Sequence, residues 1–445
     1  MFAEFLLEKF RDCRDQDAII WRDRQFSYQW LDEEVERWCR RLEDRGIGPG
    51  RVVSIESDFS PSSVALLVAL VHRGAVVVPL TDSVEAQKPQ FREIAEVEVI
   101  IAPEGEGEPS FRETGVEAGH PLYVDLRALA HPGLILFSSG STGKNKASLH
   151  DLVPFLEKFK VPRKAMRTIT FLLFDHIGGL NTLLYTLSNA GCVIAVEDRS
   201  PDPVCRAVER HRAQLLPTSP TFMNLLLLSE AHTRYDLSSL ELVTYGTEVM
   251  PETTLQRFRS LFPQVRLLQT YGLSEVGILR SKSKSSDSLW VKVGGEGFQT
   301  RVVDGLLEIK AQSAMMGYLN HESPFTPDGW FMTGDAVEVD GEYIRILGRR
   351  SEIINVGGEK VYPAEVESVI QLMEGVEDVA VRGEPNPITG QMVVARVFLK
   401  SQEDPKEFRA RLWAFCRERL PRFKIPQKVQ LAEEGMYGAR FKKMR

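Results

Sequence analysis

Residues 134–147 read Leu-Ile-Leu-Phe-Ser-Ser-Gly-Ser-Thr-Gly-Lys-Asn-Lys-Ala, an apolar run that passes directly into small, hydroxyl-bearing and basic residues. The apolar residues 134–137 predict a short buried strand. Gly140 and Gly143 allow tight bends that present backbone N–H groups on one side, and the surrounding hydroxyls and lysines add donors and positive charge. The stretch therefore predicts a polyphosphate-binding loop, with a solvated Gly/Ser turn as the alternative.

This predicted loop differs from a Walker A loop, because no glycine stands five residues before Gly143. Its donors are nevertheless numerous enough to surround a phosphate chain. The candidate phosphate-binding residues are Ser138, Ser139, Gly140, Ser141, Thr142, Gly143, Lys144 and Lys146.

The chain of 445 residues exceeds what one hydrophobic core supports, so we expect about two to four domains or subdomains. Its apolar content of 43% and charged content of 26% are ordinary for a globular protein. The net charge of −7 argues against a general nucleic-acid binder. The five cysteines are scattered and form no C-x-x-C pair, which favours free thiols in a reducing compartment over disulfides or a zinc cluster.

The N-terminal residues 1–10 place acidic side chains among apolar ones, which predicts an amphipathic helix rather than a signal peptide. The apolar run at 64–71 is too short to span a membrane, because His72, Arg73 and Gly74 follow it at once. The sequence therefore predicts a cytoplasmic chain with no membrane span.

Strand-like and helix-like segments alternate along the first 270 residues. Strands are predicted at residues 51–55, 74–79, 134–137, 168–174, 192–196, 213–217, 240–245 and 265–270. Helical segments between them indicate a parallel sheet. Polar residues follow several of these strands at their carboxyl ends, which is where open α/β sheets bind ligands.

The pattern changes after Gly277. Residues 281–288 are polar and are predicted to form an exposed loop, whereas 306–309 and 341–347 are predicted strands. From about residue 351 a glycine loop, an amphipathic helix and further strands indicate a compact α+β unit of a size that can fold alone.

Five blocks of residues, in this order along nearly the whole chain, resemble the adenylate-forming superfamily of acyl-CoA and aryl-CoA ligases, peptide-synthetase adenylation domains and luciferases. The blocks are residues 138–146, Tyr-Gly-Leu-Ser-Glu at 271–275, Gly-Trp-Phe-Met-Thr-Gly-Asp at 329–335, Gly-Arg at 348–349, and Gly-Gly-Glu-Lys-Val-Tyr-Pro-Ala-Glu-Val-Glu at 357–367. The resemblance implies an α/β fold with a large N-terminal domain of stacked α/β sheets plus a distorted β subdomain. A small mobile α+β C-terminal domain follows, with the domains at residues 1–350 and 351–445.

The resemblance implies a two-step reaction that uses ATP, Mg²⁺ and a thiol. A carboxylate first attacks the α-phosphate of ATP, which gives an acyl-adenylate and pyrophosphate. The thiol of coenzyme A, or of a phosphopantetheine carrier, then displaces AMP. The departures from the family pattern at Asn145 and Ala147, where Pro and Gly are usual, leave the donors of the predicted phosphate loop in place.

The resemblance also implies roles for residues at the strand ends. Glu275 would bind Mg²⁺, with a helix N-cap as its alternative role, and Tyr271 would stack on adenine, with a core position as its alternative. Asp335 would bind the ribose hydroxyls unless it is an ordinary turn residue, and Arg349 would approach the ribose or the phosphates. The remaining candidate nucleotide-binding residues are Gly246, Thr247, Glu248, Gln269, Thr270, Gly272 and Ser274.

His176 in Asp-His-Ile-Gly-Gly resembles the residue at the mouth of the family's acyl pocket, although a lone histidine is often structural. The predicted pocket walls are Phe174, His176, Ile177, Gly178 and Gly246. The identity of the acid stays open, with a slight preference for a small or aromatic acid over a very long chain.

The basic tail at 442–445, Lys-Lys-Met-Arg, matches the family's closing Lys-x-x-Arg. Lys442 would reach the reacting carboxylate, with Lys443 as the second choice and a solvated tail as the alternative. Phe441 stands where the family has glycine. Ser351 would be the hinge of the small domain. Gly357 and Gly358 would line the thiol channel.

Three functional hypotheses remain open from the sequence. The first is a carboxylic acid–CoA ligase, and the second is a stand-alone adenylation enzyme that loads a carrier protein. The third is a catalytically inactive nucleotide-binding regulator, which the substitutions at Asn145, Ala147, Ser351 and Phe441 would favour. The expected partners are a small carboxylic acid and, in the second case, a carrier protein; the chain could be a monomer or a homodimer.

Overall fold

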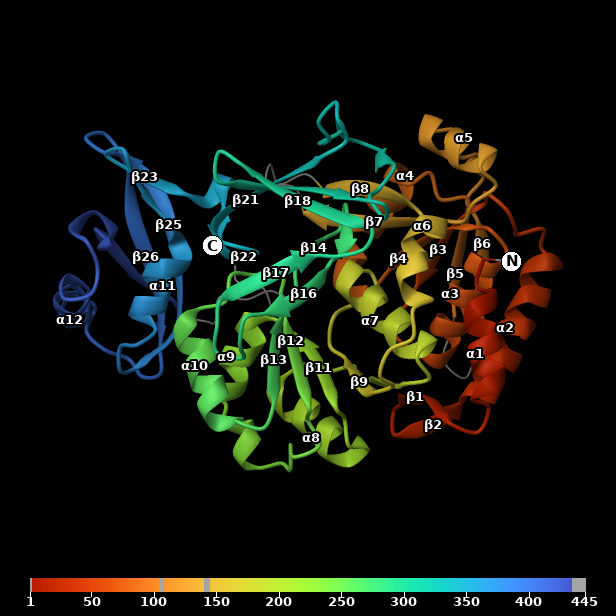
Figure 1. The fold of residues 1–445 in the computed structure, drawn as a ribbon, viewed down its shortest axis with the longest axis horizontal. Helices are drawn as coiled ribbons and strands as arrows, with labels where there is room; N and C mark the ends of the chain where they lie inside the picture. The colour runs from red at the N-terminus through yellow and green to blue at the C-terminus, as the bar shows by residue number, and fades with distance from the viewer. Residues whose placement is uncertain (1, 104–107, 140–144, 434–445) are drawn as a thin grey trace.

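The computed structural model describes residues 2–103, 108–139 and 145–433. Figure 1 shows the C-terminal part, in blue, at one end of the molecule and the N-terminal helices, in red, at the other. Two seven-stranded sheets, a six-stranded antiparallel sheet and a small C-terminal sheet carry the fold. This architecture confirms the predicted α/β class with its added β subdomain and small C-terminal domain.

The first sheet is parallel except for its last strand, β2. Its order is β13 (Arg266–Gln269), β12 (Leu242–Tyr245), β11 (Leu215–Thr218), β9 (Arg167–Thr170), β10 (Cys192–Ala195), β1 (Asp17–Trp21) and β2 (Arg24–Ser27). Helices α8 (Pro201–His211), α9 (Pro220–Leu228) and α10 (Glu252–Leu261) pack against this sheet in a shared core cluster.

The second sheet has four parallel strands at its centre and antiparallel strands at both edges. Its order is β20 (Gly317–Tyr318), β8 (Asn145–Asp151), β7 (Gly133–Ser139), β4 (Val76–Leu80), β3 (Val52–Glu56), β5 (Val99–Ala102) and β6 (Ser110–Glu113). Helices α4 (Lys88–Ile94) and α5 (Pro121–Ala128) share a core cluster with one face of it.

The largest core cluster lies between the two sheets, because it combines strand residues such as Ile19 of β1 and Val53 of β3 with helices from the intervening layer. These helices are α1 (Glu4–Asp12), α2 (Tyr28–Glu43), α3 (Pro61–His72), α6 (Leu152–Leu156) and α7 (Ile177–Ser188). Ser60 caps α3 by accepting the Ser63 N–H at 3.1 Å. Helix α3 is apolar around its whole circumference because it is buried on all sides.

The third sheet is antiparallel and follows the pattern change that the sequence shows after Gly277. Its order is β16 (Arg280–Ser283), β17 (Trp290–Gly294), β22 (Tyr343–Arg349), β21 (Phe331–Asp340), β19 (Leu306–Ala311) and β18 (Phe298–Val303). A two-stranded hairpin, β14 (Gly272–Leu273) and β15 (Gly277–Ile278), precedes it.

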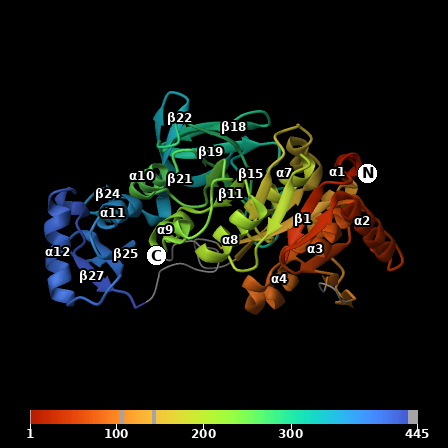
Figure 2. The same ribbon diagram turned by 90° about the horizontal axis from the view of Figure 1, so that it is seen from below.

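The C-terminal part has its own sheet and its own core cluster. It contains β23 (Ile354–Val356), β24 (Glu359–Val361), α11 (Pro363–Ile370), β25 (Val376–Asn386), β26 (Gly390–Leu399), α12 (Pro405–Arg417) and β27 (Lys428–Leu431). Figure 2 shows these elements grouped at one end of the molecule. The third sheet ends at Arg349 and the C-terminal sheet begins at Ile354, so the change of sheet falls beside the predicted domain boundary, which stays a prediction.

Three local predictions were wrong. Residues 281–283, predicted as part of a loop, belong to β16, which tolerates polar side chains because it is an edge strand with an exposed face. At the predicted loop 138–146, β7 instead continues to Ser139 and β8 starts at Asn145, so that the two strands pair antiparallel, while residues 140–144 lie outside the described part of the chain. Strand β9 ends at Thr170 rather than at Phe174.

His150 on β8 is fully buried, and neither ring nitrogen has a hydrogen-bond partner among the described residues. Burial lowers its pKa from 6.5 to about 4. As the pH falls through 6.5, His150 is protonated in the unfolded chain before it is protonated in the folded protein. The stability that the neutral, buried imidazole provides is therefore complete above pH 6.5 and is lost progressively toward pH 4.

We expect the wild type to lose about 1–2 kcal/mol more stability than His150→Leu between about pH 7.5 and about pH 5. Thermal unfolding midpoints of both proteins at the two pH values measure this difference. Equal losses for the two proteins would show that His150 does not control acid stability.

Among the described residues, no helix has the length and apolar character that crossing a membrane requires.

Candidate active site

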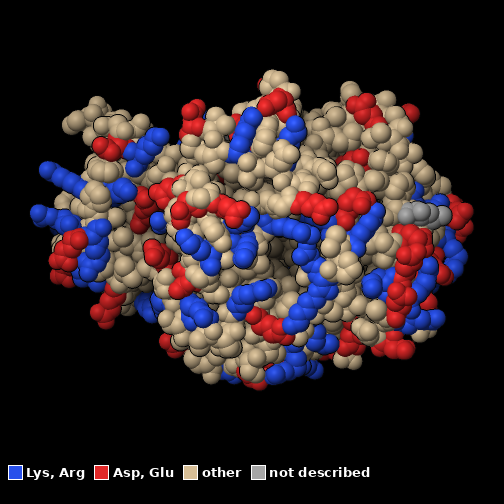
Figure 3. Space-filling view, viewed as in Figure 1, with Lys and Arg blue, Asp and Glu red and all other residues tan. Residues whose placement is uncertain are grey.

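One large cavity lies beside the carboxyl ends of the first sheet's strands, and its volume is about 1320 Å³. Figure 3 shows a hollow near the centre of one face of the molecule, with Lys and Arg side chains around it. The predicted site residues that line the cavity are Ser138, Lys146, His176, Ile177, Gly178, Gly246, Thr247, Glu248, Gln269, Thr270, Tyr271, Gly272, Ser274, Glu275, Asp335, Arg349 and Ser351. The fold thus brings most of the predicted site together.

The hairpin of β7 and β8 brings two candidate phosphate-binding residues to the cavity. Ser138 and Lys146 pair directly in the strand register, and both line the cavity wall. Lys146 Nζ lies 5.0 Å from the centroid of the Tyr318 ring. Gly140, Ser141, Thr142, Gly143 and Lys144 lie outside the described residues, and only the backbone of Ser139 is described.

The segment after β12 is held in a constrained conformation at the cavity. A Cβ atom at Gly246 would stand 2.7 Å from Thr270 Oγ1 and 2.8 Å from the Thr270 carbonyl oxygen, so only glycine fits. Thr247 has a φ of 72°, a left-handed conformation that β-branched residues rarely adopt. Glu248 accepts a hydrogen bond from the Thr221 hydroxyl at 2.7 Å. Strain of this kind concentrates at ligand-binding sites.

Tyr271 and Asp335 form a buried hydrogen-bonded pair at the cavity, in which the Tyr271 hydroxyl donates to Asp335 Oδ2 at 2.5 Å. Asp335 pairs with Arg349 in the register of β21 and β22, and Arg349 Nε lies 3.5 Å from Asp335 Oδ1. Burial raises the pKa of Asp335, while Tyr271 and Arg349 oppose that rise. Because Asp335 lies within β21, it is not an ordinary turn residue.

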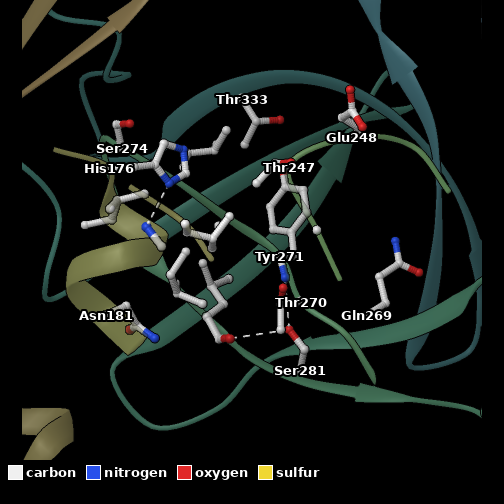
Figure 4. Close-up of a pocket in the computed structure, with 18 of the residues that line it drawn as sticks. His176, Asn181, Thr247, Glu248, Gln269, Thr270, Tyr271, Ser274, Ser281 and Thr333 are labelled. Carbon is white, nitrogen blue, oxygen red and sulfur yellow. Dashed lines mark hydrogen bonds between the residues drawn. The ribbon is translucent and has the colours of Figure 1, made fainter. Parts of the chain in front are cut away.

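Tyr271 also belongs to the core cluster of the third sheet, and burial raises the pKa of its hydroxyl. Tyr271 is therefore both a core residue of the third sheet and a residue of the cavity wall. Figure 4 shows Tyr271, Thr247 and Gln269 on one side of the pocket, with His176 and Asn181 of α7 on the other.

Glu275 is a buried carboxylate in the turn between β14 and β15, so the alternative role as a helix N-cap is wrong. The Tyr318 hydroxyl donates to its Oε1 at 2.7 Å, and the Met315 N–H donates to its carbonyl oxygen at 2.7 Å. No hydrogen bond to Oε2 comes from the described residues. The bond from Tyr318 therefore holds the carboxylate of Glu275 in place through one of its two oxygens.

His176 is the N-cap residue of α7, because its Nδ1 accepts the Gly178 N–H at 3.1 Å. This bond assigns the proton of the neutral ring to Nε2. The following Gly179 is required for packing, since a Cβ atom there would stand 1.9 Å from the Leu173 carbonyl oxygen. The motif His-x-Gly-Gly thus has a structural role in addition to lining the cavity.

The model of the AMP-binding enzyme family matches residues 7–304, which is most of the chain, and the model of its C-terminal domain matches residues 365–436. The chain belongs to the AMP-binding enzyme family. This finding confirms the resemblance to adenylate-forming enzymes that the sequence blocks indicate. Four of those five blocks contribute residues to the one cavity, and the block at 357–367 does not.

Curated relatives of this AMP-binding enzyme cover nearly its whole length. One is the 3-[(3aS,4S,7aS)-7a-methyl-1,5-dioxo-octahydro-1H-inden-4-yl]propanoyl:CoA ligase of Mycobacterium tuberculosis, 28% identical over 95% of this chain and 93% of the relative. Another is the indoleacetate–CoA ligase of Aromatoleum aromaticum, 27% identical over 94% of this chain and 91% of the relative.

The fold also matches solved structures of such enzymes. The anthranilate CoA ligase AuaEII in complex with anthranoyl-AMP has a TM-score of 0.82 at 20% identity, covering 99% of this chain and 95% of that chain. At this level of identity the match concerns the fold alone.

Three of the fully described predicted residues do not line the cavity. Phe174 is fully buried in the core, where its ring centroid lies 5.1 Å from that of Phe59, so its prediction as an acyl-pocket wall was wrong. It follows β9 in a turn, and Leu172 lines the cavity in its place. Gly357 and Gly358 form the turn between β23 and β24, away from the cavity lining. Lys442 lies outside the described residues.

The sequence analysis missed several cavity residues. Tyr318, which holds Glu275, and the row Asn181, Thr182 and Tyr185 on α7 were not predicted. Lys158 was also missed. Helical spacing could have grouped the α7 residues once His176 was placed, whereas no sequence signal marks Lys158 or Tyr318.

Proposed function

We propose that this AMP-binding enzyme is an ATP-dependent carboxylic acid–CoA ligase. The observation that carries the proposal is the convergence of the Glu275 carboxylate, the Tyr271–Asp335 pair and His176 on one cavity. Relatives with CoA ligase names span nearly the whole chain and support this class. None of the departures from the family pattern removes a charged residue that the reaction is proposed to need, which argues against an inactive regulator.

The proposed reaction has two steps. A carboxylate oxygen of the acid attacks the α-phosphorus of ATP, the bond to the bridging oxygen breaks, and pyrophosphate leaves with that electron pair. The thiolate of CoA then attacks the acyl carbon, so that the C–S bond forms and AMP leaves with the former carboxylate oxygen. Ser138 and Lys146, which line the cavity, are proposed to bind the leaving pyrophosphate. The proposal extends to the other candidate residues that the sequence predicts for this role, which are Ser139, Gly140, Ser141, Thr142, Gly143 and Lys144.

The nucleoside is proposed to bind beside the ends of β12 and β13. Asp335 would accept hydrogen bonds from the ribose hydroxyls, with Arg349 nearby, and Tyr271 would contact the adenine. Gln269 Oε1 is buried with no hydrogen-bond partner among the described residues, so a ligand donor such as an amino group would satisfy it. The other proposed contacts are Gly246, Thr247, Glu248, Thr270, Gly272 and Ser274.

The carboxylate of Glu275 fits Mg²⁺, because a hard cation takes oxygen ligands and often binds one protein carboxylate together with phosphates and water. The described residues contain no group of three or more His, Cys, Asp or Glu side chains placed to hold a metal. When bound, Mg²⁺ would neutralise phosphate charge. Tyr318 fixes the position of Glu275 for this role.

The acid is proposed to bind beside α7, where His176, Ile177 and Gly178 line the cavity opposite Gly246. We further propose that residues 351–445 form a mobile domain with its hinge at Ser351. Its movement would bring Lys442 to the reacting groups in the first step and Gly357 and Gly358 to the thiol in the second. Because ATP and CoA are cytoplasmic metabolites, the proposed reaction belongs in the cytoplasm.

Asp335→Asn is expected to raise the KM for ATP by roughly tenfold to a hundredfold, because it removes the charge from hydrogen bonds to ribose. Steady-state kinetics at varied ATP concentration measure this change. Asp340→Asn is the matched control, since Asp340 lies on the same strand but is exposed and pairs with Lys284. An unchanged KM for ATP in Asp335→Asn would remove Asp335 from the nucleotide site.

The proposed function is tested by pyrophosphate release across a panel of aryl, short-chain and medium-chain acids, with ATP, Mg²⁺ and CoA present. We expect at least one acid to give pyrophosphate, AMP and an acyl-CoA product. Pyrophosphate release without acyl-CoA would point to a carrier-protein acceptor instead. No release with any acid would contradict the ligase assignment.

A further inference from the structure

Lys158 lies in the wall of the cavity, on the side formed by α7. It lies in a short 3-10 turn, Glu157–Phe159, which packs against α7. Its Nζ donates to the Ile278 carbonyl oxygen at 3.1 Å and lies 5.3 Å and 5.0 Å from the ring centroids of Phe155 and Phe159. The ammonium group is therefore surrounded mainly by apolar and aromatic groups.

No carboxylate among the described residues pairs with Lys158, although burial disfavours its charge and lowers its pKa from 10.5 to about 7. The neighbouring Lys160, in contrast, is half-exposed and forms an ion pair with Glu157. An ammonium group has three N–H donors, and the bond to Ile278 uses one of them. The described residues thus leave two N–H donors of the protonated amine unused.

The face of α7 that lines the cavity is polar. Gly178, Asn181, Thr182 and Tyr185 follow the i, i+3, i+4, i+7 spacing of one helix face, and all four line the cavity. This face extends for about 10 Å, since a helix rises about 1.5 Å per residue. No hydrogen bond from the Asn181 amide or the Tyr185 hydroxyl to another described residue is present.

The charges that line the cavity are distributed unevenly. The side away from α7 carries charges of both signs. Its lining carboxylates are Glu248, Glu275, Asp335 and Glu352, and its lining cations are Lys146, Arg266, Arg280, Arg349 and Arg350. The α7 side contributes Lys158 and, at an exposed position, Arg163, but no carboxylate among the described residues. A second carboxylate beside Lys158 would stabilise its protonated form, whereas an apolar substituent of the acid would offer this amine no anionic partner.

We propose that the acid activated by this enzyme carries a second carboxylate, which Lys158 binds on the α7 side of the cavity. This inference rests on the proposed ligase function and specifies its substrate class as a dicarboxylic acid. One carboxylate is adenylated, while the other accepts charge-assisted hydrogen bonds from Lys158. The Asn181 amide and the Tyr185 hydroxyl supply further donors along the same face.

The test compares symmetric aryl and aliphatic dicarboxylic acids with their monomethyl esters, which keep one reactive carboxylate and lose the second charge. We expect the wild type to show a higher kcat/KM for at least one diacid than for its ester, by roughly tenfold to a hundredfold. Lys158→Met should bring this ratio close to one, mainly through the KM for the diacid. Lys160→Met is the control and should keep the wild-type ratio.

Two outcomes would overturn the inference. One is a wild type that uses every ester at least as well as its diacid, a result that needs no variant and so does not depend on the folding of Lys158→Met. The other is a Lys158→Met protein that keeps the wild-type ratio. Absence of pyrophosphate release with all acids, including monocarboxylic ones, would instead overturn the proposed ligase function.

Discussion

Glu275→Gln is expected to lower the rate of ATP–pyrophosphate exchange by about 10²- to 10³-fold, because it removes the only charge that the site is proposed to offer Mg²⁺ at this position. Glutamine keeps the shape of the side chain, and its amide oxygen can still accept the hydrogen bond from the Tyr318 hydroxyl. The turn between β14 and β15 should therefore stay intact. The loss should reflect charge rather than misfolding.

The exchange assay is run at increasing Mg²⁺ concentration, and thermal unfolding verifies that the variant is folded. We expect the Mg²⁺ concentration for half-maximal exchange to rise in Glu275→Gln. Glu322→Gln is a suitable control, since Glu322 is exposed and lies shortly after Tyr318 in the chain. Exchange at the wild-type rate would exclude Glu275 from the proposed metal site.

Lys442→Ala is expected to lower acyl-adenylate formation by about 10²- to 10³-fold while sparing most of the thioester-forming step. The physical reason is that a cation is needed where negative charge develops on the carboxylate and α-phosphate. In the proposed domain movement, this cation is withdrawn before CoA reacts. The two half-reactions are measured separately, as ATP–pyrophosphate exchange and as acyl-CoA formation from supplied acyl-adenylate.

Lys443→Ala is the matched control, because it removes an equal charge at the adjacent position. If Lys443→Ala, rather than Lys442→Ala, selectively lost acyl-adenylate formation, Lys443 would be the lysine that acts in the first step. Equal losses in both half-reactions for Lys442→Ala would contradict the proposal that the domain movement separates the steps.

The proposed nucleotide side of the site could be predicted because its residues occur in contiguous blocks. Tyr271 and Glu275 share one block, whereas Asp335 ends the block at 329–335 and Arg349 ends the block at 348–349. Once the alternation of strands and helices is recognised, the carboxyl ends of parallel strands must meet at one edge. The convergence of the residues that follow those strands can then be predicted before the strand order is known.

The acyl side could not be predicted in the same way. Phe174 was assigned to the pocket from its position beside His176, but the turn after β9 directs its ring into the core against Phe59. Lys158 stands in an ordinary-looking segment, and its place beside Ile278 depends on contact between residues more than a hundred positions apart. Tyr318 reaches Glu275 in the same long-range way.

The sequence by itself determined the α/β class, the family resemblance and the stretches that are proposed to form the nucleotide side, since these depend on local periodicity and on motifs of a few adjacent residues. Only the tertiary structure decided that β7 and β8 pair antiparallel, that Phe174 is a core residue and that Lys158 faces the cavity. Side-chain direction and charge pairing depend on which distant elements pack together, and the packing of whole layers fixes that choice.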